Sequence, residues 1–73
     1  MSKATKAIVQ DLCRRNGYEL GSARRRFTTE WVIEVYGTFD GRRVLLREAT
    51  DVALAAAYGD LAVWLRARCE QCR

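Results

Sequence analysis

Residues 28–48 read TTEWVIEVYGTFDGRRVLLRE, and this stretch decides the fold. It is rich in β-branched and aromatic residues, which favour strands. Asp40 and Gly41 in its middle are the strongest short signal for a two-residue hairpin turn. The pattern therefore predicts one strand over residues 28–39 and a second over residues 42–48, joined as an antiparallel hairpin.

A two-residue turn fixes which residues of the two strands lie opposite one another. One face of the hairpin is then apolar, with Trp31, Ile33, Val35, Val44 and Leu46. The pairs on the second face are Thr38 with Arg43, Tyr36 with Leu45, and Glu34 with Arg47. The last pair joins opposite charges, which supports this register.

Helical patterns lie on both sides of the hairpin. Residues 2–15 carry apolar side chains at helical spacing, with Ser2 as N-cap and a stop at Gly17. Residues 52–68 are rich in alanine and form a second predicted helix, capped by Thr50 or Asp51, whose apolar stripe is Leu54, Tyr58, Leu61 and Leu65. Gly59 interrupts this helix, and its small size is expected to allow close packing on the other helix or on the sheet.

The predicted order is helix, two or three antiparallel strands, helix. A third strand is indicated by the alternation of Tyr18 and Leu20. The fold class is α+β, with both helices on one face of the sheet. At 73 residues the chain is expected to be one small binding domain, residues 1–73, in which residues 66–73 form a frayed tail.

Composition places the chain among globular proteins, since 49% of its residues are hydrophobic and 30% are charged. Residues 1–8 lack the apolar run of a signal peptide, and no segment approaches the roughly 18 apolar residues of a membrane span. Three cysteines are an odd number for a disulfide framework. A cytoplasmic protein without a membrane partner is therefore expected.

Catalysis is not expected, because the chain has no histidine. Histidine is the side chain most used for proton transfer near neutral pH and the commonest metal ligand. Cys69 and Cys72 have the spacing of zinc and redox sites, but only Cys13 could add a third sulfur, and the pair follows a helix instead of opening one. We predict no catalytic residues, no metal ligands and no cofactor.

The second face of the hairpin is the leading candidate for a binding site. Two helices can cover only one face of the sheet, so apolar side chains on the other face are left for a partner. An aromatic centre with a charged rim is typical of a protein interface. The predicted protein-binding residues are Val32, Glu34, Tyr36, Arg43, Leu45 and Arg47. An ordinary two-sided sheet, which needs no partner, is the alternative.

The function predicted from these features is a small non-enzymatic protein-binding module. It would act as an adaptor or stoichiometric inhibitor, of the kind found among mobile-element and phage proteins. Such a protein occludes a surface of a larger protein or nucleoprotein complex.

Nucleic-acid binding is the alternative function, since the net charge is +4. A basic surface formed by the first helix and an arginine cluster would contact phosphates. Its residues are Lys3, Lys6, Arg14, Arg24, Arg25 and Arg26. Charge runs are more often solvated surface, which leaves both interpretations open.

The second helix is apolar nearly all round, because a further set of side chains lies off its main stripe. These are Val52, Ala56, Val63 and Trp64. Such a helix is buried on several sides or is partly covered by another molecule. A homodimer formed through Trp64 or the sheet edge is therefore an open alternative.

The layout around residues 30–37, EWVIEVYG, and 41–46, GRRVLL, resembles the double-stranded RNA-binding domain in the order and length of its elements. The resemblance implies the same helix, strands, helix arrangement. That family contacts RNA through a loop with proline and histidine and through lysines at the last helix. This chain has neither proline nor histidine, so no functional residue is carried over.

Overall fold

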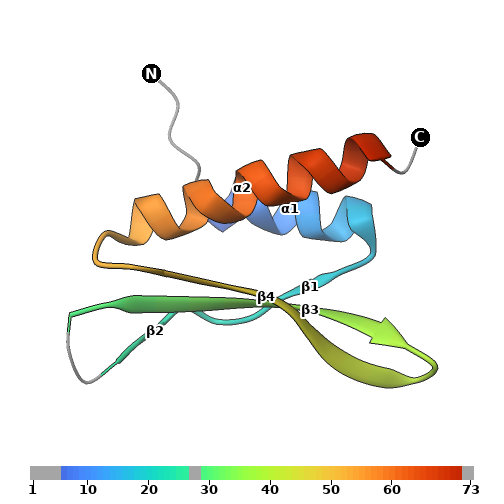
Figure 1. The fold of residues 1–73 in the computed structure, drawn as a ribbon, viewed down its shortest axis with the longest axis horizontal. Coiled ribbons are helices and arrows are strands. Elements are labelled where there is room, and N and C mark those ends of the chain that lie inside the picture. Colours follow the sequence, from blue (N-terminus) through green and yellow to red (C-terminus); the bar gives the residue numbers. More distant parts are fainter. Residues whose placement is uncertain (1–5, 27–28, 72–73) are drawn as a thin grey trace.

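The computed structural model describes residues 6–26 and 29–71. Its elements in chain order are α1 (Lys6–Asn16), β1 (Glu19–Leu20), β2 (Arg24–Arg25), β3 (Trp31–Phe39), β4 (Arg42–Asp51) and α2 (Leu54–Gln71). The α+β class and the order helix, antiparallel strands, helix are confirmed, with four strands where two or three were predicted. Figure 1 shows both helices on the same side of the sheet.

β3 is the central strand of the sheet. β4 pairs with one edge of β3 along its whole length. β1 and β2 pair with the other edge, β1 at Val35 and Tyr36 and β2 at Trp31 and Val32, so they are two short pieces of one edge. Between them the amide of Gly21 donates to the carbonyl of Glu34 at 2.7 Å, which continues the edge.

The hairpin turn is confirmed at Asp40 and Gly41. Their φ angles are 53° and 77°, and both must be positive in the turn that suits the twist of two paired strands. The predicted register also holds from the turn as far as Tyr36, which lies opposite Leu45.

Beyond that point the predicted register is wrong, because β4 contains one extra residue. Val35 lies opposite Arg47 and not opposite Leu46, which is the inserted residue of a β-bulge. The side chain of Leu46 lies over Gly37: a β-carbon at Gly37 would be 2.8 Å from Leu46 Cδ1. The missing side chain at Gly37 thus provides the space that Leu46 occupies.

The bulge changes which residues of β4 face the helices. Without it, Glu48 would lie opposite the fully buried Ile33, and burial of an unpaired carboxylate is costly. With it, Ala49 lies opposite Ile33 and is buried, and Glu48 lies opposite Glu34 on the other face. The predicted cross-strand pair of Glu34 and Arg47 is therefore not formed.

The core lies between the helices and the sheet. Its buried members are Val9, Cys13, Ile33, Val35, Ala49, Ala57, Tyr58, Leu61, Ala62 and Leu65. The stripe predicted for the second helix is confirmed, since Tyr58, Leu61 and Leu65 belong to this core and Leu54 packs against it. Gly59 takes no part, because a β-carbon there would have no atom within 4 Å among the described residues. The expectation that Gly59 allows close packing inside the molecule is thus wrong.

The helix ends follow the sequence signals. At the end of α1 the amide of Gly17 donates to the carbonyl of Arg14, and the amide of Tyr18 donates to that of Cys13, with Gly17 at φ 76°. Before α2 the carboxylate of Asp51 accepts from the amide of Ala53. Ser2 lies outside the described residues. α2 continues to Gln71, so residues 66–71, expected in a frayed tail, are helical.

We expect the same substitution to have opposite effects at two glycines. Gly17→Ala should lower the free energy of unfolding by about 1 kcal/mol, because an alanine at positive φ is strained. Gly59→Ala should raise it by up to about 1 kcal/mol, because alanine favours a helix interior and meets no atoms there. Urea unfolding of both variants at micromolar protein concentration measures the difference. Equal effects of the two changes would contradict these backbone assignments.

Candidate functional site

Val32 does not lie on an exposed patch as predicted. It is only 3% exposed and is not among the core residues beneath the helices. It lies on the face of the sheet away from the helices, here called the outer face, at a hollow lined by Arg24, Arg25 and Arg26. Val32 therefore lies on the outer face as predicted but has almost no exposed surface, and it is removed from the predicted contact residues.

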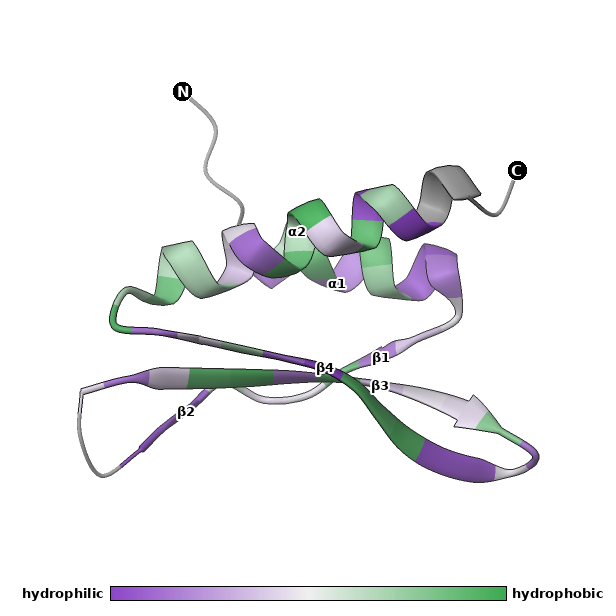
Figure 2. Cartoon of the chain, viewed as in Figure 1, coloured by the Kyte–Doolittle hydropathy of each residue, from purple (hydrophilic) through white to green (hydrophobic). Residues whose placement is uncertain are grey.

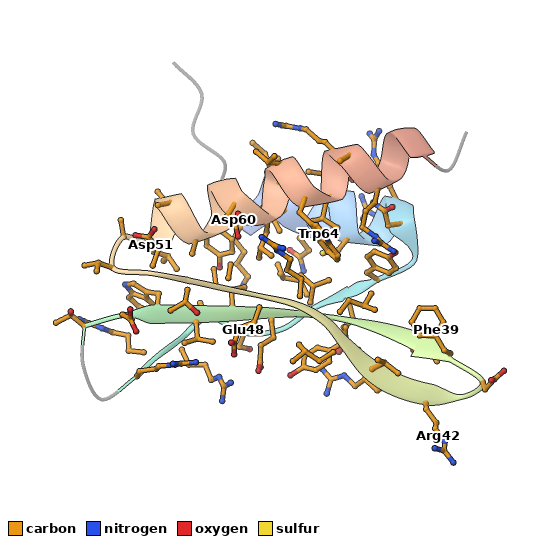
Figure 3. All side chains as sticks on the ribbon, in the orientation of Figure 1. Phe39, Arg42, Glu48, Asp51, Asp60 and Trp64 are labelled. Carbon is orange, nitrogen blue, oxygen red and sulfur yellow. The ribbon has the colours of Figure 1, made fainter. Side chains whose placement is uncertain are left out.

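Arg47 also departs from its predicted position. Because of the bulge it faces the helices, where its guanidinium lies 3.2 Å from the carboxylate of Asp60 and 5.8 Å from the ring of Trp64. Figure 3 shows Asp60 and Trp64 on the part of α2 that faces the sheet. Arg47 thus links β4 to α2, and the prediction that it borders the outer face is wrong.

The other four predicted residues, Glu34, Tyr36, Arg43 and Leu45, do lie together on the outer face. The hydroxyl of Tyr36 donates to Glu34 Oε1 at 2.7 Å, and the guanidinium of Arg43 lies 3.9 Å from the centre of the Tyr36 ring. Tyr36 is therefore half-buried under a side chain of its own molecule. Leu45 remains 49% exposed.

The hydrogen bond to Glu34 raises the pKa of Tyr36 above its ordinary value of 10.0, with further contributions from burial and from the negative charge of that carboxylate. Arg43 and Arg24 oppose this shift weakly. The hydroxyl of Tyr36 therefore stays protonated across the physiological range, where it orients Glu34.

Ion pairs cover much of the outer face. Arg24 lies 3.0 Å from Glu34, Arg43 lies 3.2 Å from Glu19, and Arg26 lies 3.6 Å from Glu48. The three arginine side chains are more than half exposed, so each pair contributes at most about 1 kcal/mol. Their main effect is to balance the charge of this face.

The residues predicted for nucleic-acid binding do not form one free basic surface. Arg14 pairs with Asp11 on α1, while Arg24 and Arg26 pair with glutamates on the outer face. Arg25 lies 5.3 Å from the ring of Trp31. Lys6 is exposed, and Lys3 lies outside the described residues. Most of these cations therefore already have a partner within the chain.

The exposed apolar side chains gather instead at the free end of the hairpin. Phe39 is 51% exposed and Val44 is 41% exposed, and Leu45 lies next to them. We call these three residues the hairpin end. Figure 1 shows β3 and β4 curving away from the helices toward the turn, which leaves this end of the hairpin half exposed.

Sequence reasoning identified Leu45 and missed Phe39 and Val44. Val44 and Phe39 belong to the helix-facing side of the sheet, so the alternating pattern placed Val44 in the core and gave Phe39 no role. The signal for their exposure was their position within four residues of the turn, where the strands curve away from the helices.

The cysteines offer no reactive centre among the described side chains. Cys13 is buried in the core, and burial raises the pKa of its thiol to about 11, which keeps it in the unreactive protonated form. The side chains of Cys69 and Cys72 lie outside the described residues. Among the side chains that the structure describes, no group of three or more His, Cys, Asp or Glu residues could hold a metal ion.

Comparison with known proteins does not assign this chain to a family. No protein family matches it, and neither a curated protein nor a solved structure matches it. The resemblance to the double-stranded RNA-binding domain thus gains no support beyond the order of the elements. In the described part of the chain, neither helix has the length and apolar character needed to cross a membrane.

We expect Glu34→Gln to lower the pKa of one tyrosine. The variant loses the negative charge that holds the proton on Tyr36, so one of the three tyrosines should ionise at lower pH in an ultraviolet titration. Glu48→Gln, on the same face but without a tyrosine contact, is the control and should leave the titration unchanged.

The raised pKa of Tyr36 makes the free energy of unfolding fall at alkaline pH. The contribution of Tyr36 to stability is fully present below the unfolded pKa near 10 and is lost as the pH rises through the folded pKa. Wild type should therefore lose more stability at alkaline pH than Tyr36→Phe. Identical alkaline unfolding of the two proteins would contradict the hydrogen bond.

Proposed function

We propose that this protein is a non-enzymatic protein-binding module whose hairpin end inserts into an apolar groove of a larger protein. The observation that carries the proposal is the grouping of Phe39, Val44 and Leu45, each 41–51% exposed, at a free end of the sheet. Grouped exposed apolar side chains mark interaction surfaces, whereas single ones need no explanation.

The hairpin end has apolar side chains on both faces. Phe39 and Val44 belong to the helix-facing side of the sheet and Leu45 to the outer face. A flat partner could cover only one of these faces. A groove with two walls would remove both from water, which favours insertion over contact with a flat surface.

Charge beside the hairpin end indicates the rim of the groove. Arg42 belongs to the same stretch of β4, forms no ion pair with any described residue, and points into solvent in Figure 3. Arg43 lies next to it but pairs with Glu19, and Asp40 stands in the turn. A carboxylate at the mouth of the partner's groove would complement the charge of Arg42.

An adaptor or inhibitor that occludes a functional groove fits these features best. It requires no catalytic group and no cofactor, only a projecting apolar segment on a folded support. Phosphate binding is less well supported, because Arg14, Arg24 and Arg26 already pair with carboxylates. Phe39 and Leu45 are the anchors that we expect to carry most of the binding energy, with Tyr36 and Arg43 supporting them.

A pair of double variants tests the proposal. Phe39→Ser with Leu45→Ser removes apolar surface from the hairpin end, while Val52→Ser with Val63→Ser removes exposed apolar surface elsewhere. The first should weaken binding to the partner at least tenfold, and the second should leave it unchanged. The partner is first captured with the tagged protein after nuclease treatment, and its affinity is then measured by calorimetry. Circular dichroism checks that both variants fold.

The nucleic-acid alternative is decided in the same preparation. Capture that disappears after nuclease treatment, or binding of duplex or single-stranded probes that weakens steeply with salt, would replace this proposal. Equal binding by wild type and the hairpin variant would show that another surface makes the contact.

A further inference from the structure

The side of α2 that faces away from the sheet is apolar along most of its length. One helical ridge of uncharged outward positions, here called the α2 ridge, consists of the exposed Ala56, Val63 and Ala67, the partly buried Gly59, and Val52 just before the helix. The exposed Asp60 and Arg66 flank it. Val52 and Val63 are 64% and 68% exposed, the highest values among the large hydrophobic residues described. Figure 2 shows that most of the α2 ribbon is pale or green, with purple only at its few charged residues.

Gly59 has no evident role within a single molecule. It lies in the interior of α2, and a β-carbon there would have no atom within 4 Å among the described residues. Glycine weakens a helix interior relative to alanine, so this position lowers the stability of the isolated chain. A glycine on an outward ridge does allow the backbone of a second helix to approach closely.

We infer that a second copy of this chain packs on the α2 ridge, with the two α2 helices antiparallel and crossing near Gly59. The order of side chains along the ridge is self-complementary under such a two-fold axis. In two antiparallel helices related by a two-fold axis, the numbers of facing residues have a constant sum. Placing Val63 of one copy on Ala56 of the other therefore also places Val52 on Ala67. Each large side chain then meets a small one, as an isologous interface requires.

Charge does not oppose this arrangement. The ridge carries no charged residue, and Asp60 beside the crossing pairs with Arg47 of its own sheet. Arg66 forms no ion pair with a described residue, and the antiparallel arrangement brings it to the end of the partner helix at which Asp51 lies. One pair of opposite charges, Arg66 of one copy and Asp51 of the other, is therefore gained at each end of the interface.

The interface is one helix wide and so belongs among small ones, which are usually weak. Dimerisation should therefore depend on protein concentration. It does not use Phe39, Val44 or Leu45, so the dimer and the proposed binding of another protein rest on separate surfaces.

Sedimentation equilibrium of the full chain over a range of concentrations tests the inference. Wild type should change from monomer to dimer as concentration rises. Val63→Lys places a charge at the centre of the ridge and should weaken dimerisation tenfold or more. Val44→Lys, an equally drastic change at the hairpin end, is the matched control and should dimerise like wild type.

Gly59→Ala supplies a second signature that a monomer could not give. It should raise the melting temperature at low concentration, because it favours the helix, and should weaken dimerisation, because it separates the two backbones. A stabilised variant with unchanged dimerisation would overturn the inference, as would a wild type that stays monomeric at millimolar concentration or a dimer that tolerates Val63→Lys. Val63→Lys should still bind the partner of the hairpin end, so the two proposals fail separately.

Discussion

The β-bulge in β4 is the constraint on which the rest of the structure depends. One inserted residue, Leu46, lets the hairpin keep a tight turn at one end and an apolar core at the other. It places Ala49 against Ile33 beneath the helices and sends Glu48 to the outer face. Gly37 makes the insertion feasible, because a side chain there would collide with Leu46. A regular ladder would have buried Glu48, so the bulge reconciles the sequence of β4 with a two-layer fold.

The same insertion divides the surface into a part whose charges are paired within the chain and a part with exposed apolar side chains. Glu48 on the outer face pairs with Arg26, while Arg47 turns inward to Asp60 and joins sheet to helix. Most charges near the middle of the sheet are thereby neutralised within the chain. Toward the turn, β3 and β4 curve away from the helices, and the apolar side chains at this end are 41–51% exposed. For this reason we propose the hairpin end, and not the middle of the outer face, as the binding surface.

Local signals predicted the parts of the fold that are set by local chemistry. The turn at Asp40 and Gly41, the stop at Gly17 and the buried stripe of the second helix each follow from a few adjacent residues, and the structure confirms them. The bulge was not predictable in this way, because it depends on contacts between sheet and helices. Only the bulged register places Ala49, and not Glu48, beneath the helices. The predicted ladder did not contain this inserted residue, and Arg47 was therefore placed on the wrong face. Val32 lies on the predicted face but is buried, and the strand beside it, β2, is too short to be read from the sequence.

The register beyond the bulge is the central claim, and nuclear Overhauser effects between the backbone protons of β3 and β4 measure it most directly. The structure predicts cross-strand effects that link Ile33 with Ala49 and Val35 with Arg47. Effects that link Ile33 with Glu48 and Val35 with Leu46 would show a regular ladder. That result would return Arg47 to the outer face and contradict the division of the surface described above.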